Sequence, residues 1–143
     1  MPNHVTNRLC ITGPWPDRDA FQATLKKDGY HGPSEGKFSF HQTVPMPADI
    51  SRGNIGFNEM EKNPKNWYNW SCNNWGTKWD CYDVQDAEIG DKSIKLEFQT
   101  AWSPPDAWMV SVSKAFPTLK FCNKWKDEGG PSGTHTLRNG EPA

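Results

Sequence analysis

The chain has 143 residues, the length of one ordinary domain, and its 16 Lys and Arg balance 17 Asp and Glu to a net charge of -1. This balance excludes an overall field that would draw the protein to nucleic acid or to an anionic membrane. The opening "MPNHVTNRLCITG" lacks the regions of a signal peptide, and no run of about 18 apolar residues occurs. We therefore expect a single soluble intracellular domain over residues 1–143.

The first predicted elements are a strand and a helix. Val5, Leu9 and Ile11 alternate with polar residues, which is typical of a half-buried strand. Residues 17–27 then show helical spacing, with Asp17 as the expected N-terminal cap. We expect a strand followed directly by an amphipathic helix.

The segment 28–63 is rich in Gly, Pro, Ser and Asn and is interpreted as a long insertion. Only "KFSFHQTVPMP", residues 37–47, has an extended pattern, and it predicts a short edge strand. After the insertion, Trp67 and Trp70 indicate a short helix that ends near Gly76.

Two further strands are predicted next. "KWDCYD", residues 78–83, alternates at period two and would place Trp79 and Cys81 on the inner face. "SIKLEFQTAW", residues 93–102, alternates clearly, and a turn at residues 90–91 would join the two strands.

The last part of the chain predicts a helix and a strand. In "WSPPDAWMVSVSKAFP", Ser103 is the expected N-terminal cap of a helix that Pro117 ends. Residues 119–126 alternate again and predict a strand. The tail 127–143 either forms one more turn or edge strand around residues 133–140, or frays.

The resulting order is strand, helix, strand, strand, helix, strand, with the long insertion before the second main strand. This order predicts an α+β ferredoxin-like split βαβ sandwich, whose antiparallel sheet carries both helices on one face. The other face is expected to be open and polar. It would carry Thr6, Arg8, Cys10, Tyr82, Lys95, Glu97, Gln99, Lys120 and Lys124.

Two asparagines interrupt the inner faces of neighbouring strands. Asn7 and Asn123 are interpreted as buried amides that are hydrogen-bonded, and they could pair with each other. The alternative is that they bind a ligand.

Several stretches resemble a known family. They are "MPNHVTNRLCITG", "NWGTKWDCYD", "FQTAWSPPDAW", "FPTLKF" and "DEGG", in this order along the chain. Together they resemble the YubB-type ferredoxin-like family found on phages and plasmids. The resemblance implies the ferredoxin-like fold and an origin on a mobile element in a bacterial cytoplasm, and it carries over no catalytic residues.

The residues themselves contain no recognisable catalytic, metal or cofactor motif. Cys81 is placed on the core face, and Asp80 and Asp83 would point to opposite faces of a strand. The four cysteines and four histidines lack metal-ligand spacing, and no glycine-rich phosphate loop occurs. We expect no cofactor and no metal.

The aromatic-rich segment offers a candidate binding site on the rim of the sheet and on the insertion. Its residues are Trp67, Tyr68, Trp70, Trp75, Lys78, Asp80, Trp102 and Trp108. The competing interpretation is that Trp75, Trp79, Trp102 and Trp108 form one buried cluster that locks helix to sheet.

Three function hypotheses remain open. The first is a non-catalytic phage or plasmid protein that binds a host protein, with inhibition of a bacterial defence system as an extension. The second is a single-stranded nucleic-acid-binding protein, because Lys62, Lys65 and Lys78 are interleaved with aromatic residues. The third is a small enzyme, which would need Arg8, Tyr82, Glu97 and His41 to converge. The oligomeric state has no signature in the sequence.

Overall fold

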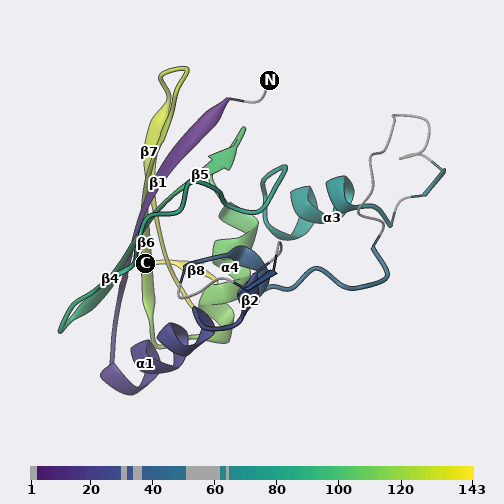
Figure 1. The fold of residues 1–143 in the computed structure, drawn as a ribbon. Helices are drawn as coiled ribbons and strands as arrows, with labels where there is room; N and C mark the ends of the chain where they lie inside the picture. The colour runs from purple at the N-terminus through teal and green to yellow at the C-terminus, as the bar shows by residue number, and fades with distance from the viewer. Residues whose placement is uncertain (1–2, 30–31, 34–36, 51–61, 64) are drawn as a thin grey trace.

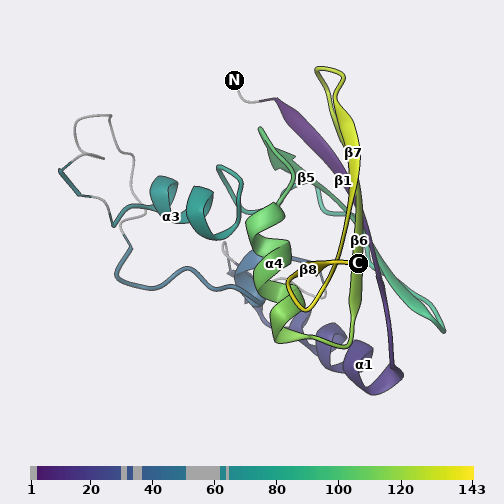
Figure 2. The ribbon, with the colours of Figure 1, turned by 180° about the vertical axis from the view of Figure 1, so that it is seen from behind.

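The computed structural model of the chain describes residues 3–29, 32–33, 37–50, 62–63 and 65–143. Its frame is the split βαβ unit, with the chain order β1 (His4–Thr12), α1 (Trp15–Thr24), β5 (Ser93–Ala101), α4 (Asp106–Ala115) and β6 (Lys120–Asp127). Figures 1 and 2 show α1 and α4 on the same side of the sheet. The predicted ferredoxin-like α+β fold is confirmed.

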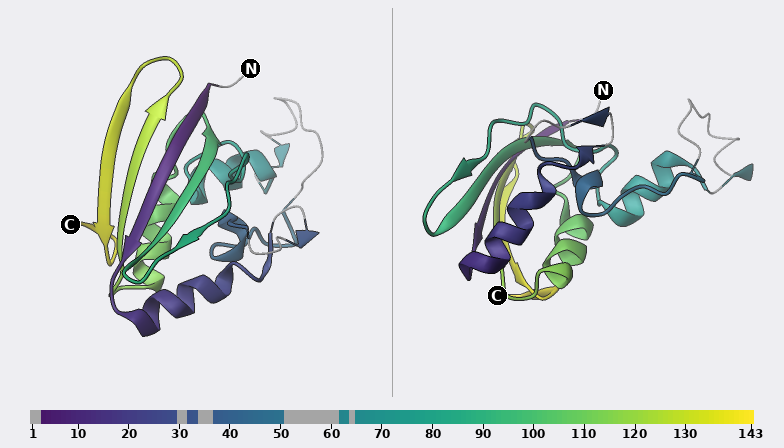
Figure 3. Two further views of the ribbon diagram at one scale, coloured as in Figure 1. Left: turned by 60° about the vertical axis from the view of Figure 1, so that its left-hand side comes forward. Right: turned by 60° about the horizontal axis from the view of Figure 1, so that its bottom comes forward.

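The main sheet has the strand order β4 (Glu88–Ile89), β5, β1, β6, β7 (Ser132–Arg138) and β8 (Glu141–Pro142), with antiparallel neighbours throughout. Figure 3, left, views this sheet from its open face, with α4 behind the strands and α1 below them. The remaining elements are β2 (Asp28–Gly29), β3 (Gly32–Pro33), η1 (Phe40–Gln42) and α3 (Trp67–Asn74).

The core lies between the sheet and the helices, because the inward positions of β1, β5 and β6 are mostly apolar and alternate with more exposed ones. The described part of the insertion also contributes to it. Phe38, Phe40 and Met46 are buried, and the Phe40 ring lies 5.0 Å from that of Trp108. Residues 37–50 therefore pack on the helix side and leave the open face uncovered, while residues 51–61 lie outside the described part of the chain.

The predicted strand at residues 78–83 is wrong. Only Tyr82 forms a bridge, to Gln99, and Asp83 leaves the strand conformation with a φ of 48°. The expected positions of residues 79 and 80 are exchanged, since Trp79 is 38% exposed and Asp80 only 6%, whereas Cys81 packs against the core as expected. The edge position beside β5 is instead completed by β4, which joins β5 through the expected turn at Gly90.

The predicted edge strand at residues 37–47 is also wrong. Phe40–Gln42 is a 3-10 turn whose start is fixed by a capping box between Ser39 and Gln42. The Gln42 amide further donates to the Leu25 carbonyl at 3.3 Å, so this turn is tied to the end of α1. A compact local hydrogen-bond set replaces strand pairing.

Neither main helix is capped by the residue that the sequence predicts, which is Asp17 for α1 and Ser103 for α4. α1 starts at Trp15 after Pro14, and Asp17 lies in its first turn, where it accepts a hydrogen bond from Thr118 at 2.6 Å. α4 starts at Asp106, because the Ser103 hydroxyl donates to the Gly76 carbonyl at 2.6 Å instead of capping the helix. The predicted helix after residue 64 is present as α3.

The tail forms an ordered part of the sheet. β7 pairs with β6 from Ser132 opposite Lys126 to Leu137 opposite Phe121, and Leu137 packs against the core. Of the two outcomes that the sequence left open for the tail, the structure contains the additional strand.

Candidate functional site

Two tryptophans stand exposed at one end of the sheet. Trp79 is 38% exposed and Trp102 is 44% exposed. The Nζ atom of Lys78 lies 4.8 Å from the centre of the Trp79 ring and 4.9 Å from that of Trp102. A lysine ammonium group is thus held by cation–π contacts with both indoles.

Further rings extend this surface on both sides. Tyr68 of α3 makes an edge contact with Trp102 at 6.1 Å, and Tyr82 makes one with Trp79 at 6.1 Å. We call Tyr68, Lys78, Trp79, Tyr82 and Trp102 the aromatic patch. Three separate segments build it, so its geometry depends on the tertiary fold.

The backbone at Trp102 has a conformation that a bulky residue rarely adopts. Its φ is 74°, in the left-handed region, and its N–H donates to the Asn3 carbonyl at 2.9 Å. The next residue, Ser103, is fixed by its hydrogen bond to Gly76, whose own φ is 81°. The surrounding structure therefore stabilises a backbone conformation at Trp102 that this residue does not favour by itself, and the Trp102 side chain is exposed there.

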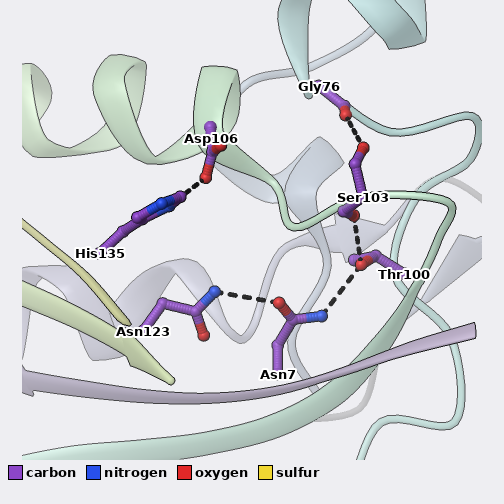
Figure 4. Close-up of polar contacts among 7 residues, drawn as sticks. All are labelled: Asn7, Gly76, Thr100, Ser103, Asp106, Asn123 and His135. Atoms are coloured by element: carbon purple, nitrogen blue, oxygen red, sulfur yellow. Dashed lines mark hydrogen bonds and ion pairs between the residues drawn. The ribbon is translucent and has the colours of Figure 1, made fainter. Parts of the chain in front are cut away.

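A chain of buried polar groups connects this corner to the centre of the sheet (Figure 4). The Asn123 amide donates to Asn7 at 3.0 Å, and the Asn7 amide donates to the Thr100 hydroxyl at 3.0 Å. Thr100 donates to the Ser103 carbonyl at 2.7 Å, and Ser103 donates to Gly76. The predicted pairing of the two buried asparagines is confirmed.

Asp80 fixes the segment behind the patch. Its carboxylate accepts hydrogen bonds from the Ser39 hydroxyl at 2.6 Å, the Phe40 N–H at 2.8 Å and the Cys81 N–H at 2.7 Å. Because these hydrogen bonds satisfy the carboxylate, the Asp80 side chain points inward although its neighbours Trp79 and Cys81 are more exposed.

Three of the candidate rim residues are buried, which corrects their assignment to a surface. Trp75 and Trp108 are both 0% exposed, and their indole N–H groups donate to the Val44 carbonyl and to the Thr43 hydroxyl, each at 2.9 Å. Asp80 is the third. The expected single buried cluster of Trp75, Trp79, Trp102 and Trp108 therefore divides into a buried pair and an exposed pair.

The other candidates lie between core and surface. Trp67 and Trp70 of α3 are half-buried and pack against the core, and the Trp70 ring meets Trp75 edge-on at 5.0 Å. Sequence reasoning missed Trp79 as a surface residue, because the period-two pattern of residues 78–83 places it inside. In the structure, the buried and hydrogen-bonded Asp80 takes the inner position, and Trp79 is therefore exposed.

The polar sheet face contains an ion pair and a cavity. Arg8 and Glu97 form a 2.9 Å ion pair, and Lys124 lies opposite Arg8 on the neighbouring strand. A cavity of about 650 Å³ lies over these strands and is lined by all three residues. Tyr82 lies at the border of this face, where its hydroxyl is hydrogen-bonded to the His4 ring.

Two weak acids near the patch, Tyr82 and Cys72, are held in their neutral forms by raised pKa values. Burial raises the pKa of Tyr82, with the charges of Asp83 and Glu128 adding to the effect. Burial also raises the pKa of the Cys72 thiol, against the opposing influence of Tyr68 and Lys78. Neither group is prepared as a nucleophile or base near neutral pH.

The residues considered for catalysis do not form a site. Burial, reinforced by Asp80, raises the pKa of the Cys81 thiol well above its ordinary value. Of the four residues of the enzyme hypothesis, Arg8 and Glu97 pair with each other, while Tyr82 is hydrogen-bonded to His4. The His41 ring accepts the Met46 N–H at 2.9 Å, so the four residues do not share one set of contacts. Within the described residues, no group of three His, Cys, Asp or Glu could hold a metal ion.

Comparison with known proteins supports the fold. Residues 75–143 match a family model described as the ferredoxin-like domain in Api92-like protein. The chain is ferredoxin-like. It is similar to the crystal structure of protein api92 from Yersinia pseudotuberculosis, with a TM-score of 0.66 and 10% identity, covering 100% of this chain and 96% of that chain. No curated protein matches the chain in sequence.

The family match lies in the C-terminal half of the chain and includes most of the aromatic patch. At 10% identity, the similarity to api92 concerns the fold. Among the helices of the described residues, none has the length and apolar character needed to cross a membrane.

Proposed function

We propose that the protein is a non-catalytic binding protein that engages another protein through the aromatic patch. The supporting observation is the exposed pair of Trp79 and Trp102 around Lys78, with Trp102 held at a φ of 74°. Tryptophan and tyrosine are enriched among the few residues that contribute most of the binding energy at protein interfaces, and an exposed group of them has no role in the core. A strained backbone at an exposed residue such as Trp102 is a further sign of function.

The kind of partner follows from the resemblance to the YubB-type family of phages and plasmids. A protein of a mobile element acts inside a bacterial host, so we propose a host protein as the partner. Inhibition of a bacterial defence system is the extension of this proposal. It rests on the resemblance and not on the geometry of the patch.

Affinity capture from host lysate tests the proposal. The tagged wild-type protein and the double variant Trp79→Ala/Trp102→Ala are compared by mass spectrometry, with and without nuclease treatment. We expect a nuclease-resistant protein partner that the double variant loses, with an affinity at least about 30-fold weaker because hot-spot tryptophans contribute 2 kcal/mol or more.

The matched control is Trp15→Ala, which removes a 54% exposed tryptophan from the start of α1. This variant should retain the partner, and the melting temperatures of all variants should show that they are folded. Equal recovery by the double variant, or no stoichiometric protein partner at all, would contradict the proposal.

Single-stranded nucleic acid is the second candidate for the same patch. The observation that favours it is the position of Lys78 between two exposed rings, since bases stack on indoles while lysines contact phosphates. Recovery that disappears with nuclease and depends on Trp79 and Trp102 would favour this function over protein binding.

A further inference from the structure

Basic and acidic residues occupy different parts of the open face of the sheet, although their numbers are nearly equal in the whole chain. Within β1, β6 and β7, alternate residues point to this face, since Phe121, Asn123 and Leu137 on the opposite positions are buried or pack in the core. The basic residues at the open-face positions of these strands are Arg8, Lys120, Lys124, Lys126 and Arg138. No carboxylate occupies an open-face position of the three strands.

The strand register brings these residues together into one area. Arg8 lies opposite Lys124, and Lys126 lies opposite Thr6 across the β1–β6 ladder. The other open-face positions hold threonine, serine, His4 and the facing pair Cys10 and Cys122, and Thr134 lies opposite Lys124 on β7. We call these positions of β1, β6 and β7 the basic face, which Figure 3, left, views from the front.

The carboxylates nearest to the basic face lie on the strands at its two sides. Glu97 on β5 pairs with Arg8, and Glu88 on β4 lies opposite Lys95. On the other side, Glu141 of β8 lies opposite Arg138. The lysines of β6 form no ion pair with any carboxylate of the described residues, so their charges are available to a partner.

We propose that the basic face binds the sugar-phosphate backbone of nucleic acid without reading its sequence. Large apolar and aromatic side chains lie at the centre of protein interfaces, whereas no Phe, Tyr, Trp, Leu, Ile, Val or Met occupies an open-face position of β1, β6 or β7. Interfaces with nucleic acid are polar and strongly positive, and Lys, Arg, Ser and Thr make their phosphate contacts. The face also lacks the aromatic residues with which ferredoxin-like RNA-binding sheets stack bases.

This surface is distinct from the aromatic patch, and its test is independent of the proposed protein partner. The probe is a short fluorescein-labelled DNA duplex, and its binding is measured by fluorescence anisotropy from about 50 to 200 mM salt. With four to five phosphate contacts, we expect the affinity to fall at least roughly a hundredfold over this range.

Matched charge variants locate the binding surface. Lys124→Gln/Lys126→Gln should weaken binding and reduce the slope of log K against log salt by about 2, because each phosphate contact contributes about 0.9. The control Lys26→Gln/Lys37→Gln changes the net charge equally at exposed positions near the end of α1 and should leave the slope unchanged. All substituted side chains are surface lysines, so melting curves should coincide.

A gain-of-function variant provides a second readout. Glu97→Gln releases Arg8 from its ion pair and should strengthen duplex binding several-fold and steepen the salt slope. If the Arg8–Glu97 pair only stabilised the fold, Glu97→Gln would not strengthen the binding of the duplex.

Four results would overturn the proposal. The first is no salt-dependent binding of the duplex, and the second is an equal loss of binding in both double lysine variants. The third is binding of poly-glutamate, but not of the duplex, that depends on Lys124 and Lys126, which would assign the basic face to an acidic protein. Binding of a single strand that depends on Trp79 alone would likewise place nucleic acid on the aromatic patch.

Discussion

Asn7 and Asn123 are fully buried at the centre of the sheet, where an apolar residue would cost no desolvation. Asn7 compensates for its burial by donating to Thr100 and to the Val5 carbonyl while accepting from Asn123. The same chain of bonds reaches Ser103 and the strained backbone next to Trp102. These side chains therefore connect the stability of the core to the position of the aromatic patch.

Replacing Asn7 by Ala should lower the free energy of unfolding by about 2 kcal/mol or more, because it leaves the amide of Asn123 and the Thr100 hydroxyl without their buried partner. Asn123→Ala should also destabilise the protein. Urea denaturation followed by tryptophan fluorescence measures both. Asn73→Ala, at an exposed position of α3, should change stability by less than about 0.5 kcal/mol. Unchanged melting of both core variants would refute this prediction.

The segment between α3 and β4 shows how a pattern of hydrophobicity can mislead at the scale of an element. Residues 78–83 alternate like a strand, yet Asp80 turns inward to cap the 3-10 turn at Phe40, and Trp79 turns out. Four hydrogen-bond donors meet the one carboxylate, from Ser39, Phe40, His41 and Cys81. Satisfying this buried charge outweighs the intrinsic preference of a short edge strand.

Asp80→Asn should destabilise the protein by about 2 to 3 kcal/mol, because an amide group would face donors that now meet a carboxylate oxygen. Hydrogen exchange should show faster exchange at the Phe40 N–H, while the N–H groups of β1 remain protected. Asp83→Asn, an exposed change three residues away, provides the control. Equal stability of the two variants would mean that Asp80 does not hold the turn.

At the scale of the whole molecule, the C-terminal tail completes the sheet. β7 covers the edge of β6 that would otherwise present unpaired backbone groups, and Leu137 closes the core beside it. The tail also places Arg138 on the basic face. The four-strand prediction thus acquires a further strand that serves both stability and surface charge.

Truncation after Gly130 should reduce the free energy of unfolding by about 3 kcal/mol or more, through loss of the β6–β7 ladder and of Leu137 burial. The exposed β6 edge should also promote aggregation, which size-exclusion chromatography measures together with thermal melting. Removal of residues 141–143 alone should cost much less. A truncated chain that remains monomeric with the wild-type melting temperature would contradict this role of β7.

The sequence alone determined β1, β5, β6, the main helices and the buried asparagine pair, because alternation and helical spacing are local properties that one face of a sheet or helix must satisfy. Only the tertiary structure decided which tryptophans are exposed. The position of Trp79 depends on Asp80, whose partner Phe40 lies 40 residues away in the chain. The basic face was decided in the same way, since the register of separate strands, and not the net charge of -1, places its cations together.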